Sequence, residues 1–386
     1  MNDKSYIYLD NAATSWPKPP EVLTAVTDAI RDDGANPGRG SHAMAVRASR
    51  ILFDGRKQLG KLFNVKDVND IVFTSNTTMA LNMAIKGFIK SGDHVIATSI
   101  EHNSVRRPLY ELEQTQQVSV TFVNTSYTGE LDVTEIQRSI QSNTKLIIVS
   151  HSSNLLGSIM PIEQIAELAK RHNIKLLVDG AQSVGILPVD VTALGIDMLA
   201  FPGHKGLLGP QGTGGLYISP QIDLAPLMQG GTGSQSETPF QPLVRPDRYE
   251  AGTPNTPGIA GLAAGVKIVL ANTVEKIAEQ QWQLTQRMME GLIRQNKVSL
   301  LGPTFGKPRT GIVSLVMDHI DSSELSFILD QHYKIAVRAG FHCTPLAHQI
   351  AGTGQTGAVR ASIGLYTTEA EVDAFIDAIH DIAKQY

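Results

Sequence analysis

The sequence predicts an α/β protein with a mostly parallel sheet that helices cover on both faces, and a smaller α+β domain at the C-terminal end. Through the middle of the chain, short and almost continuously apolar segments alternate with amphipathic ones, a pattern typical of buried parallel strands joined by helices. The chain has 386 residues, of which 42% are hydrophobic. That length allows two to three domains with a sizeable core.

Segments with the length and composition of buried strands occur at regular intervals before residue 220. They span residues 70–74, 94–98, 118–123, 145–149, 174–178, 197–201 and 214–218. Apolar residues at helical spacing predict a helix over 77–89. Another helix is expected to open at Pro161, because proline is favoured at the first helical position and the residues after it follow the helical period.

A stretch rich in Gly, Pro, Ser and Thr runs over residues 230–258. It is too long for a simple connection, and long loops in compact domains are often functional. Beyond it, the patterns predict helices over 260–270, 274–293, 323–331 and 369–384, and strands over 311–317 and 335–338. We therefore expect a large domain over 15–260, and a small domain made of 1–14 and 261–386.

Charge and cysteine content narrow the classes of protein. Lys and Arg number 33 and Asp and Glu 37, a net charge of −4, which argues against a nucleic-acid surface as the organising feature. No run of 18 apolar residues predicts a membrane helix, and the residues after Met1 lack the pattern of a signal peptide. The single cysteine, Cys343, cannot form an intramolecular disulfide, so a cytoplasmic location is expected.

Two charged residues lie just beyond the ends of predicted strands. Lys205 lies in Phe-Pro-Gly-His-Lys-Gly, between a strand and a glycine-rich loop. An isolated loop lysine is usually solvated, but a lysine in a desolvated site can act as a Schiff-base amine. Asp179 follows another strand, where it is either a helix N-cap or the carboxylate partner of a buried cation such as a pyridinium nitrogen.

Three further segments could carry chemistry. Hydroxyls at Thr77 and Thr78 open a predicted helix, as either simple caps or a phosphate site. His102 follows a strand and is either structural or able to stack on a planar cofactor or relay a proton. Cys343 lies in a polar loop after Arg338, so it is either a buried small residue or a thiolate favoured by nearby cations. Metal-binding motifs such as C-x-x-C and H-E-x-x-H are absent, so no metal is expected.

Taken together, these segments resemble the cysteine desulfurases, which are pyridoxal-phosphate enzymes of the class V aminotransferase family. The resemblance runs almost end to end. It is carried by Tyr8 to Thr14, Arg39 to His42, Thr77-Thr78, Glu101 to Asn103, Ser153-Asn154, Asp179 to Gln182, Gly203 to Lys205, Glu250 to Asn255, Arg338 to Cys343, and Arg360 to Ser362. It implies the aspartate-aminotransferase-like fold (fold type I), with a seven-stranded main sheet.

The resemblance also implies a role for each matching residue. Lys205 would hold the cofactor and move protons, Asp179 would keep the pyridine nitrogen protonated, and Cys343 would take the substrate's sulfur as a persulfide. The other cofactor-binding residues it implies are Thr77, Thr78, His102, Asn154, Gln182, His204 and Thr253, the last from the second subunit of a homodimer. Those implied for substrate binding are Ala13, His42, Asn154, Arg338 and Arg360.

The implied reaction converts L-cysteine to L-alanine and delivers sulfur to an acceptor protein. Selenocysteine lyase, or a class V aminotransferase or epimerase in which Cys343 is incidental, are the alternatives. A protein that keeps the fold only to bind sulfur-transfer partners is a further one, against which the retained Lys205 argues. The chain departs from the family at Pro202, where serine is common, and at Phe341, where the first histidine of G-H-H-C is common.

Overall fold

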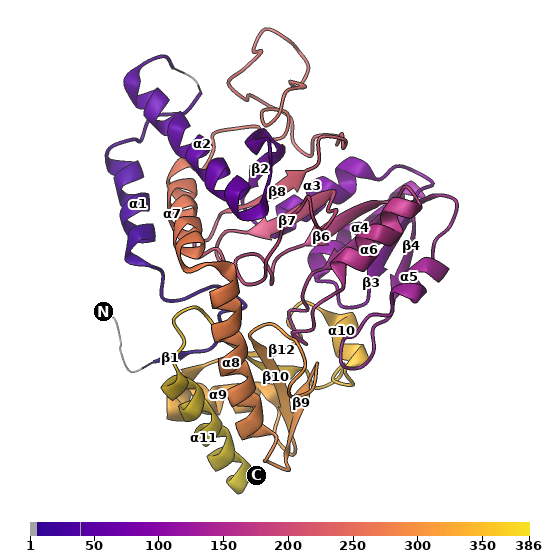
Figure 1. Cartoon of the computed structure of the whole chain (residues 1–386), viewed down its shortest axis with the longest axis vertical. Helices are drawn as coiled ribbons and strands as arrows, with labels where there is room; N and C mark the ends of the chain where they lie inside the picture. Colours follow the sequence, from indigo (N-terminus) through magenta and orange to yellow (C-terminus); the bar gives the residue numbers. More distant parts are fainter. Residues whose placement is uncertain (1–5, 39) are drawn as a thin grey trace.

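The computed structural model describes residues 6–38 and 40–386. Its centre is a seven-stranded sheet in the order β2-β8-β7-β6-β5-β3-β4 (Figure 1). The strands are β2 (Ile71–Thr74), β3 (His94–Thr98), β4 (Ser119–Val123), β5 (Thr144–Ser150), β6 (Lys175–Asp179), β7 (Met198–Pro202) and β8 (Gly214–Ile218). β8 is antiparallel to both of its neighbours, β2 and β7, and every other pairing in the sheet is parallel, so the predicted mostly parallel sheet is confirmed.

Helices cover both faces of this sheet, which explains why its central strands are apolar along their whole length. One face packs on α3 (Thr77–Phe88) and α4 (Asn103–Gln116). The other packs on α2 (Ala43–Phe63), α5 (Val133–Arg138) and α6 (Ile162–Arg171). Two more helices, α1 (Pro20–Arg31) and α7 (Thr256–Asn272), pack against each other, and α7 also packs against α2 (Figure 1).

The smaller C-terminal domain is built on an antiparallel sheet in the order β12-β13-β10-β9. Its strands are β9 (Val298–Leu301), β10 (Ile312–Met317), β12 (Arg338–Gly340) and β13 (Ala358–Ser362). Its helices are α8 (Val274–Leu292), α9 (Ser322–Tyr333), α10 (Pro345–Ile350) and α11 (Glu369–Gln385). The N-terminal strand β1 (Ile7–Tyr8) pairs with β11 (Ile335–Ala336), so the chain's start joins this domain (Figure 1).

The helix expected to open at Pro161 and the strand expected over 335–338 differ from the structure in detail. Pro161 is the N-cap of α6, one residue before the first helical position. The strand expected over 335–338 is divided into β11 and β12. Helix α7 continues through residue 260, so the boundary between 260 and 261 stays a prediction.

The buried side chain of Arg309, 4% exposed, joins the two domains. Its guanidinium donates hydrogen bonds to the carbonyl oxygens of Leu156 (3.0 Å), which follows β5, and Ile312 (2.5 Å), which begins β10. Thr310 adds a bond from its amide to the Gly157 carbonyl at 2.9 Å. These contacts fix the loop after β5 against the small domain.

Within the described ranges, no single helix has the length and apolar composition of a membrane span. Helices α7 and α8 meet that test only when taken together, across a bend of 79°.

Candidate active site

The predicted site residues converge at one edge of the main sheet because the carboxyl ends of its parallel strands meet there. His102 follows β3, Asn154 follows β5, and Asp179 ends β6. Lys205 follows β7. Strand β8 begins at this edge, where Gly214 pairs with both Thr74 and Pro202, so the N-terminus of α3 lies there as well.

A cavity at this edge brings together seven of the residues that the sequence singled out. These are His102, Asn154, Asp179, Gln182, Lys205, Arg338 and Arg360. The first five come from the large domain and the two arginines from the small one, so the cavity lies where the domains meet. It combines an amine, a carboxylate and two guanidinium groups around a small volume.

Glycines on both sides of Lys205 allow its loop to pack closely. A Cβ at Gly203 would lie 2.1 Å from Thr213 Oγ1, and one at Gly206 would lie 2.3 Å from the Val184 carbonyl oxygen.

Burial lowers the pKa of Lys205 to about 8; Arg360 lowers it further, while Asp179 opposes the shift. A substantial fraction of the amine is therefore neutral near physiological pH, as a nucleophilic lysine requires.

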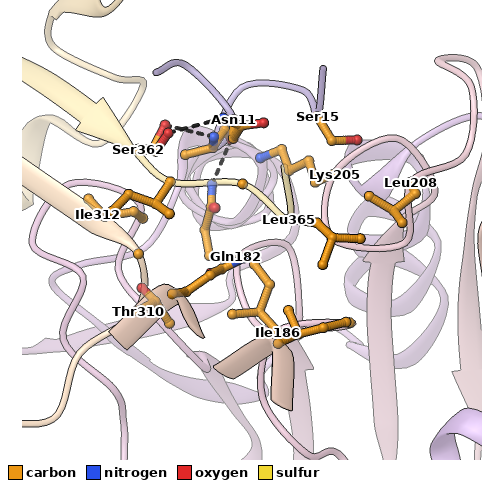
Figure 2. Close-up of a pocket in the computed structure, with 18 residues that line it drawn as sticks. Asn11, Ser15, Gln182, Ile186, Lys205, Leu208, Thr310, Ile312, Ser362 and Leu365 are labelled. Atoms are coloured by element: carbon orange, nitrogen blue, oxygen red, sulfur yellow. Dashed lines mark hydrogen bonds between the residues drawn. The ribbon is translucent and has the colours of Figure 1, made fainter. Parts of the chain in front are cut away.

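Asn11 and Ser15 of the N-terminal segment lie near Lys205, above it in the view of Figure 2. Gln182, 5% exposed, donates from Nε2 to the Ala12 carbonyl at 3.0 Å. The Ala12 amide in turn donates to Ser362 Oγ at 2.9 Å. The segment 10–15 thus connects the lysine loop with β13 of the small domain.

Asp179 is a buried carboxylate (4% exposed) whose Oδ1 accepts a hydrogen bond from the Ala181 amide at 2.9 Å. Burial raises its pKa to about 6, although that bond and Lys205 oppose the shift. The contacts that the protein makes with this carboxylate only partly offset the free-energy cost of burying its negative charge. The carboxylate suits a cationic ring nitrogen brought by a ligand.

Asp179→Asn is therefore expected to stabilise the cofactor-free protein above about pH 6. The folded-state pKa is raised, so the unfolded chain loses this proton first and the wild type loses stability between about pH 4 and pH 6, by about 2–3 kcal/mol in total. Asparagine does not titrate, and its Oδ1 can still accept from Ala181. Thermal unfolding of both proteins at about pH 4 and about pH 8 measures the effect; an equal shift at both would contradict it.

His102 lies at the start of α4 in a chain of polar contacts. Its Nδ1 accepts from the Ser104 amide at 3.1 Å and lies 2.8 Å from Ser104 Oγ, which is 2.7 Å from Thr78 Oγ1. Nδ1 is therefore the unprotonated nitrogen. Burial, followed by the positive charges of Lys205 and Arg338, lowers the pKa of His102 to about 4, so the ring is neutral.

The N-terminus of α3 is the candidate phosphate site. Asn76 caps the helix by accepting from the Met79 amide at 2.9 Å, and Thr77 and Thr78 begin it. Helix N-termini attract anions through their free amides and the helix dipole. His204 adds a second feature, because its Nδ1 is buried without a hydrogen-bond partner.

Arg360 is the most deeply buried cation of the cavity, at 1% exposed. It donates to the Asn154 carbonyl oxygen at 2.9 Å and forms an ion pair with Asp10 at 3.0 Å. Its Nε is buried without a partner. Arg338, which also lines the cavity, has no ion-pair partner among residues 6–38 and 40–386. The two guanidinium groups are thus suited to a carboxylate ligand.

Cys343 is exposed and lies on the turn between β12 and α10. Hydrogen bonds to two main-chain carbonyls fix this turn. The side-chain Nδ2 of Asn154 donates to the His342 carbonyl at 2.7 Å, and the main-chain amide of Asn103 donates to the Cys343 carbonyl at 2.8 Å. Thr344, fully buried, lies 3.2 Å from the carbonyl oxygens of both Ile100 and Glu101, just before α4, and its hydroxyl donates to them. His342 faces the cavity, whereas Cys343 is not among the residues that line it.

Several other predicted residues also lie outside this cavity. Ala12 lines it in place of Ala13. His42 is exposed and caps α2, and Arg39 lies outside the described residues. Thr253 is exposed and borders a separate, larger hollow with Thr74 and Ser75. Sequence reasoning missed Ser150 and Ser152, which line the cavity because they end and follow β5; their position at a strand end was the available signal.

Comparisons with known proteins agree with this geometry. A model of the class V aminotransferase family matches residues 7–375. The chain therefore belongs to the class V aminotransferase family. It is 34% identical to a probable cysteine desulfurase of Methanothermobacter thermautotrophicus, over 98% of this chain and 95% of that one. It is 33% identical to a cysteine desulfurase of Yersinia pseudotuberculosis, over 100% and 95%.

Solved structures give the same relationship. The apo cysteine desulfurase of Thermococcus onnurineus NA1 superposes with a TM-score of 0.93 at 33% identity, covering 99% of this chain and 95% of that one. The cysteine desulfurase CsdA of Escherichia coli, in an S-sulfonic acid form, gives 0.88 at 26% identity over the same shares. The expected fold type I architecture is confirmed.

Proposed function

We propose that this chain is a pyridoxal-phosphate-dependent cysteine desulfurase that converts L-cysteine to L-alanine and takes the sulfur onto Cys343. The observation that carries the proposal is one arrangement: Lys205 and Asp179 line a cavity, and the only thiol of the chain lies on the turn that borders it through His342. Relatives named cysteine desulfurase over almost the whole chain support the same activity.

The residues present suit pyridoxal phosphate. Asp179 offers a buried carboxylate to the ring nitrogen, Lys205 an amine to the aldehyde, and the α3 N-terminus with His204 Nδ1 offers donors to the phosphate. His102 would lie against the ring, and Gln182 and Asn154 beside it. When bound, the cofactor supplies an electron sink for the substrate carbon.

The chain's own residues would perform the remaining steps. Arg360, with Arg338 and Asn154, would hold the substrate carboxylate, and Lys205 Nζ would move protons at the substrate carbon. The Cys343 thiolate would bond to the substrate sulfur as the carbon–sulfur bond breaks. The carbon fragment keeps the electron pair and is protonated to alanine, and the sulfur stays on Cys343 as a persulfide.

The positions of Thr253 and His42 support a homodimer with shared active sites. Both are exposed and outside the cavity of their own chain, so they would serve the site of a second copy. Exposure of Cys343 suits delivery of sulfur to an acceptor protein. We place this reaction in the cytoplasm, where a lone thiol stays reduced.

The test is turnover with L-cysteine by the purified holoenzyme. We expect sulfide and alanine in equal amounts when a reductant is present, and a mass increase of one sulfur atom on Cys343 when it is absent. Because the chain has one cysteine, whole-protein mass spectrometry assigns the site without mutating others. Formation of alanine without a reductant, with no added sulfur on the protein, would contradict the proposed role of Cys343.

The exposed position of Cys343 also keeps selenocysteine lyase as a second candidate, because selenium leaves carbon more readily than sulfur and depends less on a nucleophile. Comparing turnover of L-cysteine and L-selenocysteine separates the two. Amino transfer that depends on a keto acid, without sulfide, would instead indicate a class V aminotransferase.

A further inference from the structure

The helix that follows the cysteine turn, α10, carries a histidine that the proposed function does not use. His348 on α10 is fully buried, and His342 beside Cys343 is 3% exposed. The two rings lie nearly parallel, at 9°, and His348 Nε2 is 3.3 Å from His342 Nδ1. The two imidazoles are therefore hydrogen-bonded to each other next to the thiol.

The outer contacts of this pair decide which nitrogens carry hydrogen. His342 Nε2 lies 3.4 Å from the Arg338 carbonyl oxygen, which can only accept, so Nε2 is the donor. In a neutral ring His342 Nδ1 then accepts, and His348 Nε2 donates to it. His348 Nδ1 is left as an acceptor, 2.7 Å from Thr353 Oγ1, which donates to it.

Both imidazoles are neutral. Burial lowers the pKa of His342 to about 3, and Arg360 lowers it further. Burial lowers the pKa of His348 to about 4. Because both nitrogens of His342 are engaged, this residue has no free proton or lone pair to offer a substrate, and its role at the cavity wall is structural.

The backbone of the turn needs such support. His342 and Cys343 have φ angles of 51° and 58°, in the left-handed region that side-chain-bearing residues rarely adopt. Such residues persist only where the surroundings hold them. Asn154 and Asn103 hold the two carbonyls. The His342 ring is held by Arg338 on one side and by His348 on the other.

We propose that His348 is a positioning residue for Cys343: by donating to His342, it holds the left-handed turn that places the thiol beside the cavity. What the thiol does there rests on the proposed function, whereas the placement of the turn rests on these contacts alone. His348 is not among the described residues that line the substrate cavity.

The test compares two substitutions at this position. The amide of glutamine reaches the place of His348 Nε2 and can donate to His342, whereas asparagine reaches only the place of Nδ1 and leaves His342 Nδ1 without a donor. We expect His348→Asn to lower kcat for sulfide release at least about tenfold, with a smaller change in KM for L-cysteine. His348→Gln should retain activity within about threefold. His332→Asn, on the exposed end of α9, is the matched control.

A second readout needs no turnover. Since Cys343 is the only cysteine, iodoacetamide alkylation of the holoenzyme reports on this thiol alone. His348→Asn should change its rate at least about threefold, and His348→Gln should restore it. Thr353→Val, which removes the donor to His348 Nδ1 without emptying the core, should shift the rate in the same direction, and Thr353→Ser should not.

Wild-type alkylation in His348→Asn, or a defect in His348→Gln equal to that in His348→Asn, would overturn the proposal. So would an unchanged rate in Thr353→Val if His348→Asn does not fold. If the wild type releases no sulfide from L-cysteine, the proposed function fails, while the alkylation rates still decide the positioning role.

Discussion

Lys205→Ala is expected to reduce sulfide release from L-cysteine at least about 1000-fold, because Lys205 is the only lysine among the described residues that line the cavity, and its amine would bind the cofactor's aldehyde and move protons at the substrate carbon. Burial and Arg360 both lower the pKa of this amine, which keeps it partly neutral. Activity measured beside the visible absorbance of the protein-bound cofactor checks the result. We expect the rate of sulfide release to fall and the visible absorbance of the bound cofactor to shift.

Lys170→Ala is the matched control, because Lys170 is an exposed lysine on α6. It should keep both turnover and absorbance. Lys205→Ala protein that still turned over L-cysteine within tenfold of the wild type would remove Lys205 from the reaction. The Asp179→Asn protein offers a further comparison, since it should lose activity while Lys205 remains.

Much of the main sheet was predictable because strands buried on both faces must be apolar along their length. The same logic placed Asp179 and Lys205, since polar residues directly after such strands meet at one edge. The antiparallel direction of β8 was not predictable, because a run of apolar residues does not indicate in which direction its strand runs in the sheet. Its direction is set by its pairing with β2 and β7.

The small domain's part of the site was harder to predict. Strand β13 was not predicted because Arg360 interrupts its apolar pattern. The partners of this buried charge are distant in sequence: Asp10, 350 residues away, pairs with it, and the Asn154 carbonyl oxygen accepts from it. His348 gave no signal either, since a single histidine near a short helix is usually a surface residue. Its role depends on packing against His342, which the sequence does not specify.

Cys343→Ser is expected to abolish sulfur transfer from L-cysteine, with a loss of at least about 100-fold, because a hydroxyl in the same place is not ionised at physiological pH and is a poor nucleophile toward sulfur. The substitution changes one atom in an exposed position on a turn whose main-chain hydrogen bonds remain. Fold and cofactor binding should therefore be unchanged. Sulfide release and alanine formation are measured together with the visible absorbance.

Two comparisons make this result decisive. If Cys343→Ser keeps wild-type release of selenide from L-selenocysteine while losing sulfide release, the thiol is needed for sulfur chemistry and the cavity alone serves selenium. If it keeps wild-type sulfide release from L-cysteine, the thiol is incidental. Cys343, which lies outside the cavity lining, would then not carry sulfur in the reaction. The turn's contacts to Asn154 and Asn103 favour the first outcome, because they hold an otherwise unfavourable backbone at the one position where a thiol borders the cavity.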